Sequence, residues 1–133
     1  MQIDHVVFEV RDPAESVAFY GTLLGFEPVR LDEFRASTVP FPSLRIASGT
    51  IIDLFPREMW VAAEQRNPHH VCFSASTTEL AAIKQRLAAH SIPLTKVDDH
   101  NFGARGFGRS IYFDDLDGIS IEVRDYPDPG PMS

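Results

Sequence analysis

The sequence predicts an α+β fold made of two consecutive β-α-β-β-β modules. A direct repeat supports the duplication: residues 5–8 (His-Val-Val-Phe) return as residues 70–73 (His-Val-Cys-Phe), and residues 49–53 return in similar form as residues 118–122. The order of expected strands and helices is also the same on both sides of a connector at residues 57–68. Because an internal duplication sets the architecture, we interpret the two modules as copies of one unit.

The first module, residues 1–56, begins with a strand and a helix. Residues 1–10 are rich in β-branched and aromatic side chains, which is typical of a strand. Asp12 is a good helix N-cap, Pro13 suits the first helical position, and Gly25 is a plausible stop. Short strands are then expected at residues 28–32, 43–47 and 50–55.

The second module, residues 69–126, repeats this order. A strand is expected at residues 69–74, followed by a helix that begins after the capping box from Ser76 to Glu79. Further strands are expected at residues 94–97, 109–114 and 119–124.

The glycine-rich segment 98–108 also contains Phe102 and Phe107. It predicts either a mobile flap whose aromatic side chains close over an organic molecule, or an ordinary long hairpin loop. The tail, residues 127–133, is expected to be irregular.

Length and charge exclude several classes of protein. The 133 residues fit a single domain of ordinary composition, and the net charge of −7 gives no general attraction to nucleic acid or anionic lipid. No apolar run approaches the roughly 20 residues of a membrane span, and no secretion signal is visible. The single cysteine, Cys72, cannot form a disulfide within the chain. We therefore expect a cytoplasmic protein with no nucleic-acid or membrane partner.

One face of the predicted sheets collects polar side chains, because successive strand residues point to opposite faces. These residues are His5, Glu9, Arg45, Asp53, His70, Ser74, Ser110, Tyr112 and Glu122. One alternative is an ordinary solvated face. However, the first strand of each module places histidine at the same position, and the last strand places a carboxylate. Two imidazoles and two carboxylates form a ligand set that suits Zn, Ni, Co, Fe or Mn and leaves two octahedral positions open.

These residues also carry a family resemblance. Asp4-His5-Val6, His70-Val71-Cys72-Phe73 and the run from Tyr112 to Gly118 leading into Glu122 resemble the vicinal oxygen chelate superfamily. That superfamily includes glyoxalase I, the bleomycin-resistance proteins, the fosfomycin-resistance enzymes and the extradiol dioxygenases. The resemblance covers about residues 2–126 and implies a cupped, half-barrel mixed sheet with helices on its outer face, the glyoxalase-like fold.

The resemblance implies metal ligands at His5, His70 and Glu122. Asp53 occupies the fourth position, where glyoxalase I usually has glutamate, and its shorter side chain could ligate the ion directly, through water, or not at all. Glu9 stands where bacterial-type glyoxalase I usually has an arginine for glutathione, which argues against that substrate. Phe102 and Gly106 stand where the glutathione-dependent fosfomycin enzymes have a lysine and a serine.

The expected function is a metal-dependent isomerase or lyase that acts on a small oxygen-rich substrate through an enediolate-like intermediate. Tyr112 is a candidate donor to a developing oxyanion, and Glu9 or Asp53 is a candidate general base. The candidate substrate-binding residues are Arg45, Phe102, Arg109, Ser110 and Arg124. Two alternatives remain: an Fe(II) extradiol-type dioxygenase built on the two histidines and Glu122, and a bleomycin-resistance-like binding protein.

We also expect a homodimer, as is usual for family members of this length. Met59, Trp60 and the proline-rich tail 126–131 are candidates to cover a partner, since aromatic residues and methionine are enriched at interfaces.

Overall fold

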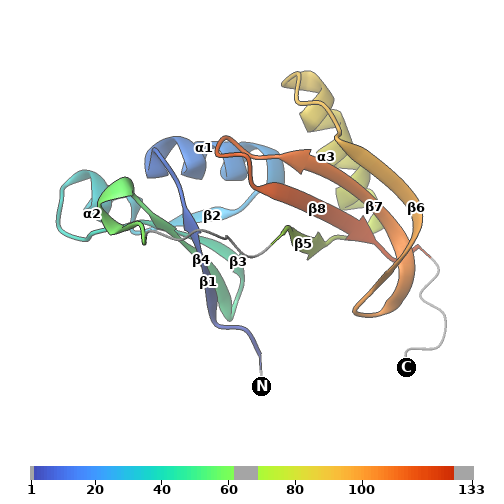
Figure 1. Ribbon diagram of the computed structural model, residues 1–133, viewed down its shortest axis with the longest axis horizontal. Coiled ribbons are helices and arrows are strands. Elements are labelled where there is room, and N and C mark those ends of the chain that lie inside the picture. The colour runs from blue at the N-terminus through green and yellow to red at the C-terminus, as the bar shows by residue number, and fades with distance from the viewer. Residues whose placement is uncertain (1, 62–68, 128–133) are drawn as a thin grey trace. The chain divides into compact units, whose positions relative to one another are not determined.

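The computed structural model describes residues 2–61 and 69–127 and divides the chain into two compact units. Unit 1 spans Met1–Glu64, and unit 2 spans Gln65–Ser133. Each unit contains one four-stranded sheet and its own helices (Figure 1). None of the helices in the described ranges is long and apolar enough to cross a membrane.

Unit 1 is a mixed sheet with the strand order β1-β4-β3-β2. The edge strand β1 runs parallel to β4, while the other neighbouring strands are antiparallel. Its elements in chain order are β1 (His5–Glu9), α1 (Pro13–Leu24), β2 (Glu27–Val29), α2 (Leu31–Arg35), β3 (Ser43–Ala47), β4 (Thr50–Phe55) and the 3₁₀ turn η1 (Arg57–Met59).

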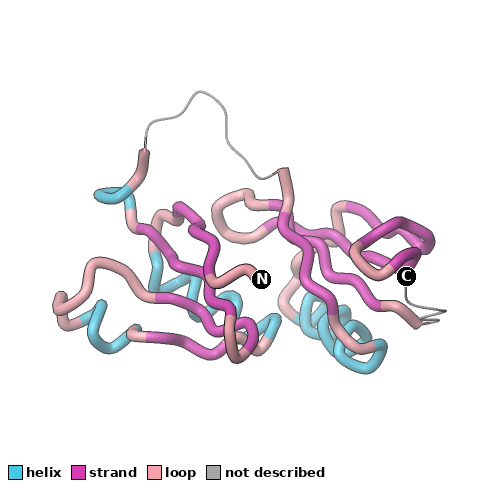
Figure 2. The backbone as a smooth tube through the Cα atoms, turned by 90° about the horizontal axis from the view of Figure 1, so that it is seen from below, coloured by secondary structure: helices cyan, strands magenta, loops and turns pink. Residues whose placement is uncertain are grey.

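Unit 2 repeats this topology with the strand order β5-β8-β7-β6. Here too the edge strand, β5, runs parallel to its neighbour β8, and the remaining pairs are antiparallel. Its elements are β5 (Val71–Ser74), α3 (Thr77–Ala89), β6 (Lys96–Gly103), β7 (Gly106–Asp114) and β8 (Ser120–Asp125). In Figure 2, α3 lies on one face of this sheet.

The predicted helix boundaries are confirmed at α1 and α3. The Asp12 side chain accepts a hydrogen bond from the Glu15 backbone N–H, and the Ser76 side chain accepts one from the Glu79 backbone N–H. Each bond satisfies an N–H that has no partner within the helix. Gly25 ends α1 in the left-handed conformation, with φ of 74°.

The strand expected at residues 28–32 is wrong in its second half. β2 ends at Val29, and α2 begins at Leu31. Arg30 between them adopts φ of 61°, a left-handed conformation that turns the chain out of the strand. Arginine has no special preference for that conformation, so no local signal in the sequence marks the turn.

The glycine-rich segment 98–108 forms a paired β-ribbon instead of a loop. β6 continues to Gly103, β7 starts at Gly106, and Phe102 pairs with Phe107 across the ribbon. The His100 ring stacks on Phe107 with 4.2 Å between the ring centroids. Gly106 has φ of 100°, which a residue with a side chain rarely adopts, and this allows the tight turn.

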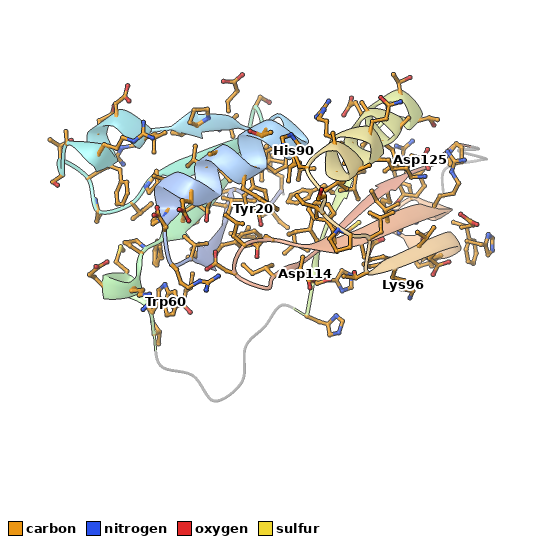
Figure 3. All side chains as sticks on the ribbon, turned by 90° about the horizontal axis from the view of Figure 1, so that it is seen from above. Tyr20, Trp60, His90, Lys96, Asp114 and Asp125 are labelled. Carbon is orange, nitrogen blue, oxygen red and sulfur yellow. The ribbon has the colours of Figure 1, made fainter. Side chains whose placement is uncertain are left out.

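Each unit has its own apolar core between its sheet and its helix. In unit 1, Tyr20 on α1 is fully buried (Figure 3). The other buried apolar side chains there are Phe8, Val10, Val17, Leu23, Leu44, Ile52 and Leu54. Those of unit 2 are Leu80, Ile83, Leu87, Ile111, Phe113, Ile121 and Val123. Burial of these side chains on one face of each sheet leaves the polar residues of the same strands on the other.

Candidate functional site

Unit 1 places a histidine beside a carboxylate on two neighbouring parallel strands. His5 begins β1, and Asp53 lies in β4 opposite Val7. The Nε2 atom of His5 is 3.9 Å from Oδ2 of Asp53. On the other side of the ring, Nδ1 lies 2.8 Å from Oδ1 of Asp4, and this hydrogen bond raises the pKa of His5. With Nδ1 engaged as a donor, the free lone pair of the neutral ring is on Nε2.

Asp53 is buried and has a second partner in the sheet. The Ser43 hydroxyl, from the antiparallel strand β3, donates to Oδ1 of Asp53 at 2.7 Å. Oδ1 is therefore occupied by the serine, while Oδ2 is the oxygen that faces His5.

Unit 2 contains the same arrangement. His70 immediately precedes β5, and Glu122 in β8 lies opposite Cys72. In both units the carboxylate is thus paired with the residue two positions after the histidine. The Nε2 atom of His70 is 3.2 Å from Oε1 of Glu122, and its Nδ1 atom is 3.0 Å from Nδ1 of His69.

Several donors converge on the other oxygen of Glu122. Oε2 accepts hydrogen bonds from the Ser110 hydroxyl at 2.5 Å and from the Asn101 side-chain amide at 3.3 Å, and lies 3.5 Å from a guanidinium nitrogen of Arg124. Burial alone would raise the pKa of Glu122, but hydrogen bonds from Ser110, Tyr112, Cys72 and Asn101 outweigh it and lower the pKa. Glu122 is therefore ionised at neutral pH.

Tyr112 lies directly opposite Glu122 in the β7–β8 pairing. Burial and the hydrogen bond to Glu122 raise the pKa of Tyr112 above its ordinary value. Its hydroxyl also accepts a hydrogen bond from Asn101 at 3.2 Å. The phenol consequently stays protonated at neutral pH, as a hydrogen-bond donor must.

Sequence reasoning missed Asn101, which it placed in a loop. The pairing between β6 and β7 shifts between Asp98 and Asn101, and this irregularity turns the amide toward Tyr112 and Glu122. A β-bulge of this kind re-aims a side chain. The sequence has no signal that locates it.

A pocket of about 350 Å³ opens beside Glu122 in unit 2. Its lining combines polar and aromatic side chains: His70, Cys72, Ser74, Phe102, Arg105, Glu122, Arg124 and Tyr126, with backbone from Gly103 and Ala104. Burial, followed by the nearby charge of Glu122, raises the pKa of the Cys72 thiol to about 12. Cys72 is therefore a neutral side chain of this pocket and not an activated nucleophile.

Arg124 is held by the ribbon above it. Its guanidinium group donates to the backbone carbonyls of Asn101 at 2.8 Å and Phe102 at 3.2 Å, and it lies over the Tyr126 ring. Its Nε atom is buried and has no hydrogen-bond partner among the described residues. Through these contacts Arg124, which lies in β8, binds the backbone of β6.

The other candidate substrate-binding residues lie in different surroundings. Arg109 points away from Ser110 and forms a two-bond ion pair with the buried Asp125, at 2.6 and 3.0 Å. Arg45 is exposed on β3, where it donates to the Ser48 carbonyl at 3.4 Å. Phe102 is 75% exposed and packs edge-on against Phe107 while lining the pocket.

The remaining predicted residues belong to unit 1 or to the tail. Glu9 accepts a hydrogen bond from the Val61 backbone N–H at 2.8 Å. Met59 lies in η1, and Trp60 follows it with its indole N–H bonded to the Phe55 carbonyl at 3.0 Å. Residues 128–131 of the expected interface lie outside the described residues.

The His70–Glu122 pair fits a shared metal ion. Two ligands about 2.1 Å from one ion and at right angles are about 3.0 Å apart, close to the 3.2 Å separation of Nε2 and Oε1. The 3.9 Å separation in the His5–Asp53 pair is wider and requires a small side-chain shift. Within residues 2–61 and 69–127, no three His, Cys, Asp or Glu side chains are gathered closely enough to hold an ion.

Comparison with known families identifies the fold. The family model for the glyoxalase/bleomycin resistance protein/dioxygenase superfamily matches residues 2–123. The chain belongs to this superfamily. The predicted α+β, glyoxalase-like fold is therefore confirmed, and both four-stranded mixed sheets agree with it.

Relatives within the superfamily are diverse. Virulence protein STM3117 of Salmonella typhimurium is 30% identical over 129 residues, which cover 94% of this chain and 84% of that protein. Its crystal structure matches with a TM-score of 0.75 over 95% of this chain and 97% of that chain. A glyoxalase/dioxygenase from Nostoc punctiforme is 26% identical, with a TM-score of 0.72 over 96% of this chain and 92% of that chain.

A more distant member shows the same fold with a metal. The fosfomycin resistance protein FosX of Listeria monocytogenes, solved with Mn(II) and a dihydroxypropylphosphonic acid, is 20% identical. Its TM-score is 0.69, over 93% of this chain and 91% of that chain. At this identity the match shows the shared fold alone.

Proposed function

We propose that this superfamily member is a metal-dependent isomerase or lyase that acts on a small oxygen-rich substrate. The residues proposed to bind divalent metal are His5 and Asp53 in unit 1 and His70 and Glu122 in unit 2. The observation that carries the proposal is the repeated pair of histidine Nε2 and carboxylate oxygen, which recurs at the same strand register in both units. A solvated sheet face gives no reason for such a repeat.

The ligand set suits a catalytic ion. When bound, a divalent ion polarises the oxygens of a substrate as a Lewis acid. Asp4 and His69 engage the Nδ1 atoms of His5 and His70, which directs both Nε2 atoms toward the carboxylates. Ring orientation by such outer contacts is typical of metal-binding histidines.

Proton transfer is assigned to the polar groups around the ligands. The Tyr112 hydroxyl donates its one proton to Glu122 in this structure, and we propose that it turns to donate to a substrate oxygen that gains negative charge. Glu9 is the proposed general base that removes a proton from the substrate carbon, because Asp53 is occupied by Ser43 on one oxygen and is proposed to bind the ion with the other.

The unit 2 pocket supports a small organic substrate. Phe102 and Tyr126 offer aromatic surface, while Arg105 supplies positive charge at the same wall. A carboxylate at Glu9, in place of the arginine that holds glutathione in bacterial-type glyoxalase I, favours a substrate other than a glutathione adduct.

One observation favours a second candidate. His5 and Asp53 are farther apart than His70 and Glu122, at 3.9 against 3.2 Å. If Asp53 does not bind the ion, then His5, His70 and Glu122 form a two-histidine, one-carboxylate set, which is typical of Fe(II) oxygenases.

Metal analysis separates these functions. Protein purified without chelator should contain about one divalent ion per chain, and His70→Ala should lose most of it because a principal ligand is gone. His90→Ala, at the C-terminal end of α3, is the matched control and should keep full occupancy. Stoichiometric iron with oxygen uptake would support the oxygenase. A metal-free protein that binds a small molecule tightly would contradict both enzymes and favour a binding protein.

A further inference from the structure

Each candidate ligand carboxylate has one of its two oxygens held by a serine. In unit 1, Ser43 donates to Oδ1 of Asp53 at 2.7 Å; in unit 2, Ser110 donates to Oε2 of Glu122 at 2.5 Å. All four residues are buried, with exposed fractions between 2 and 8%. In both units the serine comes from the antiparallel strand next to the carboxylate strand, β3 beside β4 and β7 beside β8.

The other oxygen of each carboxylate faces the histidine. Oδ2 of Asp53 lies toward Nε2 of His5, and Oε1 of Glu122 lies toward Nε2 of His70. In both units, therefore, one carboxylate oxygen faces the histidine and the other accepts a hydrogen bond from a serine. A carboxylate held in this way cannot rotate freely, because turning it would break a buried hydrogen bond.

The geometry points to Ser43 and Ser110 as positioning residues that make each carboxylate a ligand through a single oxygen. This inference rests on the proposed metal-dependent function. Ser110 was expected to contact substrate, but its hydroxyl is directed elsewhere. A hydroxyl has one proton to donate, and the 2.5 Å contact with the ionised Glu122 takes it in preference to the 3.0 Å contact with Asn101.

Single-oxygen binding has a consequence for catalysis. At each histidine–carboxylate pair, binding through one carboxylate oxygen would use one coordination position fewer than binding through both, and that position would be available to an oxygen of the substrate. The serines would thus keep open the positions that the proposed chemistry requires.

The test is titration of metal-free protein with Co²⁺ and Zn²⁺ by calorimetry, which measures affinity independently of turnover. Ser43→Ala and Ser110→Ala should each weaken binding by about 10–100-fold, the usual effect of losing an outer-shell partner. Ser43→Thr and Ser110→Thr keep the hydroxyl and should restore most of the affinity. Ser16→Ala removes an equally buried serine on α1 and should leave binding unchanged.

The same titration includes the wild-type protein and His70→Ala. If the wild type binds one ion, His70→Ala abolishes binding and both serine-to-alanine variants bind within twofold of the wild type, the positioning role is overturned while the proposed function stands. If the wild type binds no divalent ion, the proposed function fails and the role of the serines fails with it. Circular dichroism of each variant verifies that the fold is intact.

Discussion

The main chain at Gly103 lies directly against the guanidinium group of Arg124, two strands away in the sheet of unit 2. A Cβ atom at Gly103 would overlap this guanidinium group and the Tyr126 hydroxyl, so a larger residue would displace the buried, hydrogen-bonded Arg124 side chain. The contact brings the ribbon of β6 and β7 down onto β8, where Arg124 binds the carbonyls of Asn101 and Phe102. The wall of the pocket beside Glu122 therefore depends on a residue without a side chain.

Gly103→Ala should destabilise unit 2 and deform this wall. Overpacking of a tight contact commonly costs about 1–3 kcal/mol, so the melting temperature should fall by several degrees. Gly49→Ala is the matched control, because a Cβ there meets only the flexible end of the Gln2 side chain. Thermal unfolding followed by circular dichroism measures both variants. Equal melting temperatures for Gly103→Ala and Gly49→Ala would contradict tight packing between Gly103 and Arg124.

Asp53 and Glu122 should contribute unequally to metal binding. Glu122 is already within 3.2 Å of its histidine, whereas Asp53 is 3.9 Å from His5 and must move to reach a shared ion. Glu122→Gln should lower metal affinity by more than about 100-fold. Asp53→Asn should lower it less, by about 10–100-fold.

Calorimetric titration measures the metal affinity of both variants. A turnover assay of Asp53→Asn then distinguishes a metal ligand from a general base. If Asp53 acts only as a base, metal occupancy should survive while turnover drops by about 10²–10⁴. Unchanged occupancy and unchanged turnover would remove Asp53 from the site.

The Arg109–Asp125 ion pair should make stability depend on acid pH. Hydrogen bonding from Arg109 lowers the pKa of the buried Asp125 despite the opposing effect of burial. Because the folded-state pKa is below the unfolded value of about 3.9, the stabilisation is fully present above that value and is lost as the pH falls through the folded-state pKa.

Arg109→Gln should therefore lower the free energy of unfolding at pH 7 and at pH 5. The difference in this free energy between the variant and the wild type should shrink below about pH 4. Urea unfolding at several pH values measures it. Arg35→Gln, an exposed arginine at the end of α2, serves as the control and should show little change. A difference from wild type that stays constant down to pH 3 would contradict this account.

The protein is expected to form a homodimer. Light scattering at micromolar concentration should therefore give a molecular mass of about twice the 14.9 kDa of one chain. The expected contact includes Trp60, which remains partly exposed beside Arg57. Trp60→Ala should shift the equilibrium toward monomer, since a buried aromatic residue commonly anchors an interface. A metal-loaded monomer with full activity would contradict both the dimer and any site shared between chains.

The β-α-β-β-β order, the helix boundaries at Asp12 and Ser76 and the strands Ser43–Ala47 and Thr50–Phe55 follow from the sequence, because capping residues and alternating side chains are local signals. The repeated histidine and carboxylate positions are equally visible, since a duplication keeps the strand register. Alternation also places Arg109 on the face of Ile111, away from Ser110, and the ion pair with Asp125 agrees with it.

The tertiary structure alone decided which oxygen of each carboxylate is occupied and by what. Ser43 and Ser110 meet their carboxylates through strand pairing, and Asn101 reaches Glu122 through an irregularity in that pairing. The approach of Gly103 to Arg124 depends on strands that are separated by β7. Contacts of this kind depend on the register between strands and on the curvature of the ribbon. Neither can be derived from the spacing of residues along the chain.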